Sequence, residues 1–197
     1  MPLLALLYYF GTNYEQFSKN VLAGIFFGFL GDALLLADDP FSPLVIPGIF
    51  SFFIGHVLYM VSFLRETGFC NYKKYFFVFL LLCGIFFYGA NFAFKYLKDG
   101  FTRGGVMIPG LSYLILLALL NITSGFYFFT YFNRYSLLTF IGSFVFFVSD
   151  FILVRKMFYE EREYYQVSLM ATYILAQSLI CYGLAHRKNI HEEIKTN

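Results

Sequence analysis

The sequence predicts an all-α, polytopic transmembrane helix bundle of about seven helices. Of its 197 residues, 59% are hydrophobic and 13% are charged, whereas soluble domains are about 45–50% apolar and about 25% charged. The mean hydropathy is +0.67. The apolar residues gather in continuous runs of roughly 17–25, the length of a helix that crosses a bilayer. Continuous runs favour helices over the alternating strands of a β-barrel.

Six apolar runs are the expected transmembrane helices. They cover residues 21–37, 47–64, 75–94, 106–128, 135–154 and 164–185. A seventh uncharged run, residues 2–11, is short for a full span, and its status stays open between a half-span, a helix packed on its neighbours and the remnant of a longer helix. It lacks the basic region and the A-x-A site of a cleaved signal peptide.

Short polar connections separate the runs, at residues 38–43, 71–74, 98–105 and 155–163. None is long enough to form a second domain, so we expect residues 1–197 to form a single transmembrane helical domain. Lys and Arg are divided almost evenly between the two sets of loops, which leaves the orientation open. We expect an integral, multi-pass protein of a bacterial inner membrane or an equivalent membrane. The net charge of +2 is too small to indicate a nucleic-acid partner.

Two aspartates interrupt the apolar runs, and they are the strongest candidates for function. An ionised Asp at the bilayer centre costs about 2.5–3.5 kcal/mol on insertion scales, so such residues usually mark a site. Asp32 and Asp150 each lie six residues before a charged residue, Asp38 and Lys156 respectively, beyond the end of the run. With alternating helices, both are expected about 9 Å below the same membrane surface. We therefore expect the two carboxyl groups to face one cavity.

Further polar side chains lie in the same half of the helices or at mid-depth. We expect them to bind substrate or to support the carboxylates: His56, Tyr59, Asn91, Tyr113, Ser149, Tyr173 and Gln177. Tyr173 and Gln177 are four residues apart and so share a helix face. Taken singly, each of these residues is as well explained by packing. Gly24, Gly28 and Gly31 form a small face on the Asp32 helix, suited to close packing of another helix.

Several other catalytic classes lack their motifs. The chain contains neither a G-x-S-x-G elbow nor an H-E-x-x-H pair, so serine-esterase and zinc-hydrolase mechanisms are not supported. It has three His and three Cys, without a CxxC pair. We therefore expect no metal site and no cofactor.

Five stretches, in order along the chain, resemble motifs of the YhhN family of membrane proteins, which includes the lysoplasmalogenases. They are GFLGDALL (28–35), GIFSFFIGHVLY (48–59), PGLSY (109–113), GSFVFFVSD (142–150) and TYILAQSLI (172–180). The resemblance covers about residues 24–183. It implies eight helices with a Lys-Pro pair opening the second. Since the printed sequence starts at Met1-Pro2, we expect the first helix and that Lys to be missing, either because the start is truncated or because the site manages without them.

The resemblance implies hydrolysis of the vinyl-ether bond of lysoplasmalogens, with Asp32 and Asp150 as the catalytic aspartates. The products are a fatty aldehyde and a glycerophospho-head-group. Such a bond is cleaved when an acid protonates the terminal alkene carbon and water captures the resulting oxocarbenium ion, which takes one carboxylic acid and one carboxylate. The sequence does not distinguish the two roles. The expected partners are the lysophospholipid substrate and membrane lipid, and the oligomeric state stays open.

Two alternatives remain from the sequence alone. The aspartates could carry protons in a non-enzymatic carrier, although no internal repeat of the kind found in transporters is visible. The protein could also hydrolyse a different lysolipid. For an ether hydrolase we expect a pocket that is polar at its mouth and apolar at depth, with Phe146 and Phe147 against the lipid chain.

Overall fold

The computed structural model describes residues 19–35, 42–67, 75–159 and 163–186, and these form a bundle of helices. The helices are α2 (Lys19–Leu34), α3 (Val45–Thr67), α5 (Phe76–Arg103), α6 (Met107–Tyr131), α7 (Arg134–Phe158) and α8 (Glu163–Ala185). The described part contains six helices and no strand, which confirms the all-α fold class. The run at residues 2–11 lies outside the described residues.

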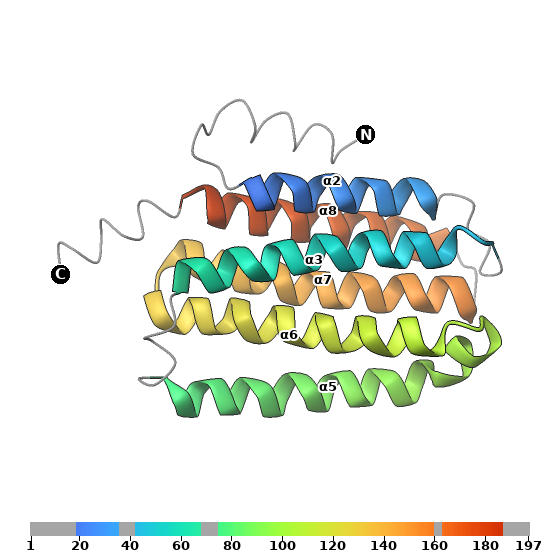
Figure 1. The fold of residues 1–197 in the computed structure, drawn as a ribbon, viewed down its shortest axis with the longest axis horizontal. Coiled ribbons are helices and arrows are strands. Elements are labelled where there is room, and N and C mark those ends of the chain that lie inside the picture. Colours follow the sequence, from blue (N-terminus) through green and yellow to red (C-terminus); the bar gives the residue numbers. More distant parts are fainter. Residues whose placement is uncertain (1–18, 36–41, 68–74, 160–162, 187–197) are drawn as a thin grey trace.

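Successive helices run in opposite directions, so alternate ends meet at each side of the bundle (Figure 1). The carboxyl ends of α2, α5 and α7 lie together with the amino ends of α3, α6 and α8. Helices α2, α3, α7 and α8 lie close to one another, while α5 lies at the opposite edge of the bundle, against α6 (Figure 1). This arrangement brings the end of α2 near the end of α7.

Five of the described helices are long and apolar enough to cross a membrane. They are α3, α5, α6, α7 and the Tyr165–Ala185 part of α8. The described part of α2 has 16 residues, or about 24 Å of helix at 1.5 Å per residue. The chain is therefore an integral, multi-pass membrane protein.

Glycines allow α2 and α3 to pack closely. A methyl group added at Gly55 would lie 3.1 Å from the carbonyl oxygen of Gly24, and one added at Gly31 would lie 2.8 Å from the ring of Phe52. Tyr59 occupies the space beside Gly24 in the same way. The small face expected on the Asp32 helix is thus a helix contact, as small-residue motifs in membranes usually are.

Helix α5 is longer than the sequence predicts. The expected run ended at residue 94, with residues 98–105 as a loop, but α5 continues to Arg103. Leu97 and Phe101 keep the helical spacing of buried residues after Ala93, and Lys98 lies on the exposed side. The turn follows at Gly105, whose φ of +66° suits glycine.

The ends of α5 and α7 pack on each other. The backbone N–H of Gly100 donates to the hydroxyl of Tyr159 (3.1 Å), which in turn donates to the carbonyl of Tyr96 (2.8 Å). Since Gly100 has no side chain, the ring of Tyr159 fits directly against the helix backbone. Helix α7 likewise runs on to Phe158, so the first part of the expected 155–163 loop is helical.

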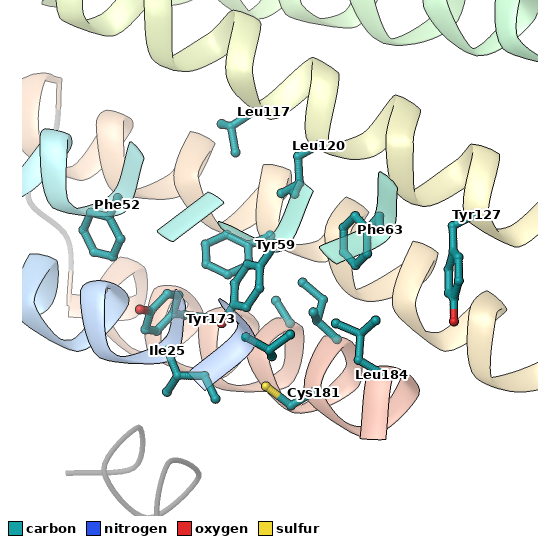
Figure 2. Packing of buried hydrophobic residues seen from close by; sticks show 14 of the residues in the cluster. Ile25, Phe52, Tyr59, Phe63, Leu117, Leu120, Tyr127, Tyr173, Cys181 and Leu184 are labelled. Atoms are coloured by element: carbon teal, nitrogen blue, oxygen red, sulfur yellow. The ribbon is translucent and has the colours of Figure 1, made fainter. Parts of the chain in front are cut away.

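The largest buried cluster joins α2, α3, α6, α7 and α8. Its side chains include Phe52, Tyr59 and Phe63 of α3, with Tyr173 and Leu184 of α8. Figure 2 shows Phe52 and Tyr173 near one end of the cluster and Leu184 farther along it, at the Tyr127 end. The Phe52 and Tyr173 rings meet edge to face, 6.1 Å apart. The polar residues of the candidate site lie against this cluster.

Candidate active site

Asp32 and Asp150 line one pocket of about 110 Å³, at the end of the bundle where α2 and α7 end. Its other polar lining residues are Ser149, Lys156, Gln166 and Tyr173. Its apolar lining residues are Leu35, Phe52, Leu153, Leu169 and Met170. The two carboxyl groups therefore reach the same cavity from different helices.

Asp150 is a buried carboxyl group, 4% exposed. The hydroxyl of Tyr113, on α6, donates a hydrogen bond of 2.9 Å to its Oδ2 atom. The Nε2 atom of His56, on α3, lies 3.8 Å from the same oxygen. Three helices thus fix the position of this carboxyl group.

His56 is held in one orientation by its surroundings. Its Nδ1 atom lies 2.7 Å from the carbonyl oxygen of Phe52, one turn earlier in α3. A carbonyl only accepts hydrogen bonds, so Nδ1 carries the proton and donates it. The ring is clamped edge to face by Phe146, at 4.5 Å, and by Tyr113, at 5.5 Å. In the neutral ring Nε2 is then an acceptor directed towards Asp150.

Asp32 is more open to the pocket than Asp150. It is half-buried and lies within three residues of the end of α2 as described. Tyr173 of α8 lines the same pocket. The Tyr173 ring is fixed between Phe52 and Phe146, in edge-to-face contacts of 6.1 and 5.3 Å. Asp32 thus has a rigid polar neighbour and access to the cavity.

Tyr59 and Gln177 lie behind this pocket. The Tyr59 hydroxyl donates to Oε1 of Gln177, and both side chains are buried. This hydrogen bond joins α3 to α8 about one helical turn along α8 from Tyr173. These two residues support the site from behind and do not line the cavity.

Ser149 precedes Asp150 on α7 and lines the pocket. Its hydroxyl group is buried and makes no hydrogen bond within the described residues. A buried hydroxyl group without a partner is unusual and is often explained by water or a ligand.

Asn91 is the one expected site residue that the structure does not bring into this group. It is exposed on α5, at the opposite edge of the bundle from α2 and α8 (Figure 1). The helical register of α5 turns Ala90, Ala93 and Leu97 inward instead. The facing side of α5 was not predictable from the sequence, and since α5 runs on to Arg103, Asn91 also lies farther from the helix end than expected.

The apolar lining differs from the expectation that Phe146 and Phe147 contact a lipid chain. Phe146 is 1% exposed and packs against His56 and Tyr173, so it is a core residue. Neither Phe lines the pocket. A second, almost entirely apolar cavity adjoins the first and shares Asp150, Phe52, Leu35 and Leu153 with it. It continues towards α5 and α6 through Phe101, Val106, Gly110 and Tyr113.

Two polar residues of the pocket, Lys156 and Gln166, were not expected from the sequence. Both fell in or beside the predicted 155–163 loop. On α8, the pocket residues Gln166, Leu169, Met170 and Tyr173 follow the i, i+3, i+4, i+7 spacing of one helix face. This spacing can be seen in the sequence and was the signal that could have placed Gln166 on the same face as Tyr173.

The arrangement is suited to proton transfer. One carboxyl group is buried, accepts a hydrogen bond from a phenol and lies 3.8 Å from an imidazole nitrogen, and a second is half-buried on the same cavity wall. Two carboxyl groups beside one cavity can divide the roles of acid and base. The described residues contain no group of three or more His, Cys, Asp or Glu that could hold a metal ion.

Comparison with known proteins gives one match. No curated protein and no solved structure matches the chain. The family model of the YhhN family matches residues 1–184, a range that includes Asp32, Asp150 and every other residue of the pocket. The chain therefore belongs to the YhhN family.

Proposed function

We propose that this protein is a membrane hydrolase that cleaves the vinyl-ether bond of lysoplasmalogens. The observation that carries the proposal is the pair Asp32 and Asp150, which line one pocket from two helices inside a transmembrane bundle. Vinyl-ether hydrolysis requires an acid that protonates the alkene and a base that activates the attacking water. Membership of the YhhN family agrees with this reaction class.

The reaction proceeds in balanced steps. The acid gives its proton to the alkene carbon farther from the ether oxygen. A lone pair of the ether oxygen stabilises the cation that results, which is an oxocarbenium ion. The other carboxylate takes a proton from water as the water oxygen bonds to the cationic carbon. The hemiacetal then loses its bond to the glycerol oxygen, which takes the proton held by the second carboxyl group, while the hemiacetal hydroxyl gives its proton to the first. One aldehyde and one alcohol result, and both carboxyl groups return to their starting states. Overall, one water molecule is consumed.

Solvent access assigns the two roles. Asp150 is 4% exposed, while Asp32 is half-buried on the pocket wall. We assign proton donation to Asp150, since it is shielded from competing water, and activation of water to Asp32. Tyr113 holds the Asp150 carboxyl group in place through a hydrogen bond, and His56 packs beside it, as supporting residues of a catalytic acid must. The hydroxyl of Ser149 is positioned to bind the ether oxygen or the attacking water.

The two cavities fit a lipid with one chain and one polar head. The polar groups and Lys156 belong to the first cavity, and the adjoining second cavity is lined almost entirely by apolar side chains. The bond to be cleaved joins head to chain, and Asp150 lies where the two cavities meet. A single-chain lipid would therefore place its labile bond beside this carboxyl group.

The test is the product formed by the purified protein in detergent. A lysoplasmalogen and its 1-acyl counterpart are supplied separately, and aldehyde and fatty acid are both quantified. We expect free aldehyde from the vinyl ether and little fatty acid from the ester. Fatty acid without aldehyde would indicate an ester hydrolase. Neither product, with proton uptake in proteoliposomes, would instead support a carrier.

A further inference from the structure

A basic residue lies in the wall of the same pocket, where α7 ends. Lys156 belongs to the last turn of α7 and lines the cavity with Asp32 and Asp150. Its Nζ atom donates to Oε1 of Gln166, near the start of α8. The mouth of the cavity therefore presents an ammonium group and an amide from two different helices.

The faces of α7 and α8 lead from this mouth to the carboxyl groups. Along α7 the lining residues are Ser149, Leu153 and Lys156, and along α8 they begin at Gln166 and end at Tyr173. Spacings of three and four residues keep each set on one side of its helix. Lys156 and Asp150 are six residues apart, or about 9 Å along the axis. Along α7 the cavity wall thus runs from a cationic residue to a carboxyl residue.

That separation matches a lysoplasmalogen. Seven bonds separate the phosphorus from the terminal alkene carbon that must be protonated, counted through the glycerol and the ether oxygen. An extended chain advances roughly 1.2 Å per bond, so these bonds span roughly 8 Å. A phosphate beside Lys156 therefore brings the alkene carbon to the depth of Asp150.

We propose that Lys156, oriented by Gln166, binds the phosphodiester of the substrate and so sets which bond reaches the aspartates. The inference rests on the proposed function, because it takes a lysophospholipid as the bound molecule. An ammonium group binds phosphate as a point charge with several donors. Gln166 can add an N–H donor to a second phosphate oxygen while its carbonyl oxygen keeps Lys156 in place.

Neighbouring basic residues are directed elsewhere and provide controls. Arg155 donates to the hydroxyl of Tyr96 at 2.8 Å, and its guanidinium group lies over the ring of Tyr165. Lys98 is exposed on α5, at the same end of the bundle as Lys156, and does not line the pocket. A Lys98→Gln variant removes the same charge from the same membrane face and leaves the cavity unchanged.

The test separates binding from catalysis by using ligands that cannot react. Binding of a 1-O-alkyl lysophospholipid and of a 1-O-alkylglycerol, which lacks the phosphate, is measured calorimetrically in detergent. The variants are Lys156→Gln, Lys156→Arg and Lys98→Gln. We expect Lys156→Gln to weaken binding of the phospholipid roughly tenfold or more, as loss of a charge-assisted hydrogen bond does. It should leave binding of the alkylglycerol unchanged, with most affinity retained in Lys156→Arg and all of it in Lys98→Gln.

The outcomes distinguish this inference from the proposed function. Equal weakening by Lys98→Gln, or equal loss for both ligands in Lys156→Gln, would overturn the phosphate site. Displacement of the lipid by inorganic phosphate at equal concentration would overturn the assignment to a lipid phosphodiester, because it would indicate a site for free phosphate. Because the ligands are not cleaved, these results hold whether or not aldehyde is released. If aldehyde is released and the phospholipid preference survives in Lys156→Gln, the inference fails while the proposed function stands.

Discussion

At the scale of single residues, the site consists of two carboxyl groups in unlike surroundings. Asp150 accepts from Tyr113 and faces His56, while Asp32 is half-buried on the cavity wall. The sequence indicated these residues because Asp inside an apolar run is costly. It could not indicate the hydrogen bond between Tyr113 and Asp150, which joins helices 37 residues apart in the chain. Asn91 is as polar as the residues around the two aspartates, but the register of α5 turns it outward.

The first prediction concerns the two aspartates. Asp32→Asn and Asp150→Asn should each lower aldehyde release about 10²-fold or more, because an amide keeps the shape but cannot transfer the proton. Asp99→Asn, an exposed carboxylate on α5, is the matched control and should retain full activity. Initial rates on purified, monodisperse protein provide the measurement. More than about a tenth of the activity in either variant would count against paired catalysis.

The second prediction concerns the phenol that holds Asp150. Tyr113→Phe removes the donor and keeps the ring, so kcat should fall about 10- to 100-fold, as expected for loss of a hydrogen bond to the carboxylate that forms as Asp150 gives up its proton. The 1-O-alkyl lysophospholipid should bind as before, since the hydroxyl contacts the carboxyl group. Tyr88→Phe, on the exposed side of α5, is the control. An unchanged kcat, or loss confined to KM, would remove Tyr113 from the positioning of Asp150.

At the scale of helices, glycines decide which pairs pack closely. Beside the contact of α2 with α3, Gly183 of α8 lies against α7: a methyl group there would be 2.6 Å from the carbonyl oxygen of Tyr135. By contrast, a methyl group at Gly84 of α5 would meet nothing within 4 Å. The apolar runs predicted where helices lie along the chain. The presence of a glycine in a run did not reveal whether that glycine lies in a contact between helices. The ends of α5 and α7 were missed because hydropathy falls at Lys98 and Arg155. Buried residues nevertheless continue beyond Lys98 in α5, and half-buried Met157 and Phe158 follow Arg155 in α7.

The third prediction compares these two glycines. Gly183→Ala should lower the thermal unfolding midpoint in detergent, because the added methyl group forces α7 and α8 apart, at a cost of about 1–3 kcal/mol. Gly84→Ala should leave the midpoint unchanged or raise it, since alanine favours a helix by about 1 kcal/mol over glycine. Equal shifts for the two variants would contradict the packing of α7 against α8.

At the scale of the whole molecule, the alternation of helix directions brings the carboxyl ends of α2 and α7 to the end of the bundle that holds the pocket. The all-α bundle was predictable from continuous apolar runs, since only helices satisfy the backbone within such segments. Counting residues along alternating spans placed both aspartates towards the same end of the bundle, where they line one pocket. The order of helices around the bundle was not predictable, because hydropathy carries no information on lateral neighbours. That order leaves α5 at the edge and brings α7 against α8 (Figure 1).

The fourth prediction tests this topology. Single cysteines at Lys98 and Gln166, in a cysteine-free background, should react with a membrane-impermeant thiol reagent from the same side of sealed vesicles. A cysteine at Arg134, the first residue of α7, should react only from the other side. All three positions are exposed. Labelling of Arg134→Cys and Lys98→Cys from one side would contradict the alternating arrangement.

The measurement closest to the central claim is cleavage of a lysoplasmalogen in D₂O. Proton donation to the alkene carbon must leave one deuterium on the carbon next to the new aldehyde group. We expect aldehyde, trapped rapidly and analysed by mass spectrometry, to carry one deuterium at that carbon. Under the same conditions, Asp150→Asn should form almost none. Aldehyde without deuterium, or undiminished formation of labelled aldehyde by Asp150→Asn, would contradict an acid-catalysed vinyl-ether hydrolysis at this pocket.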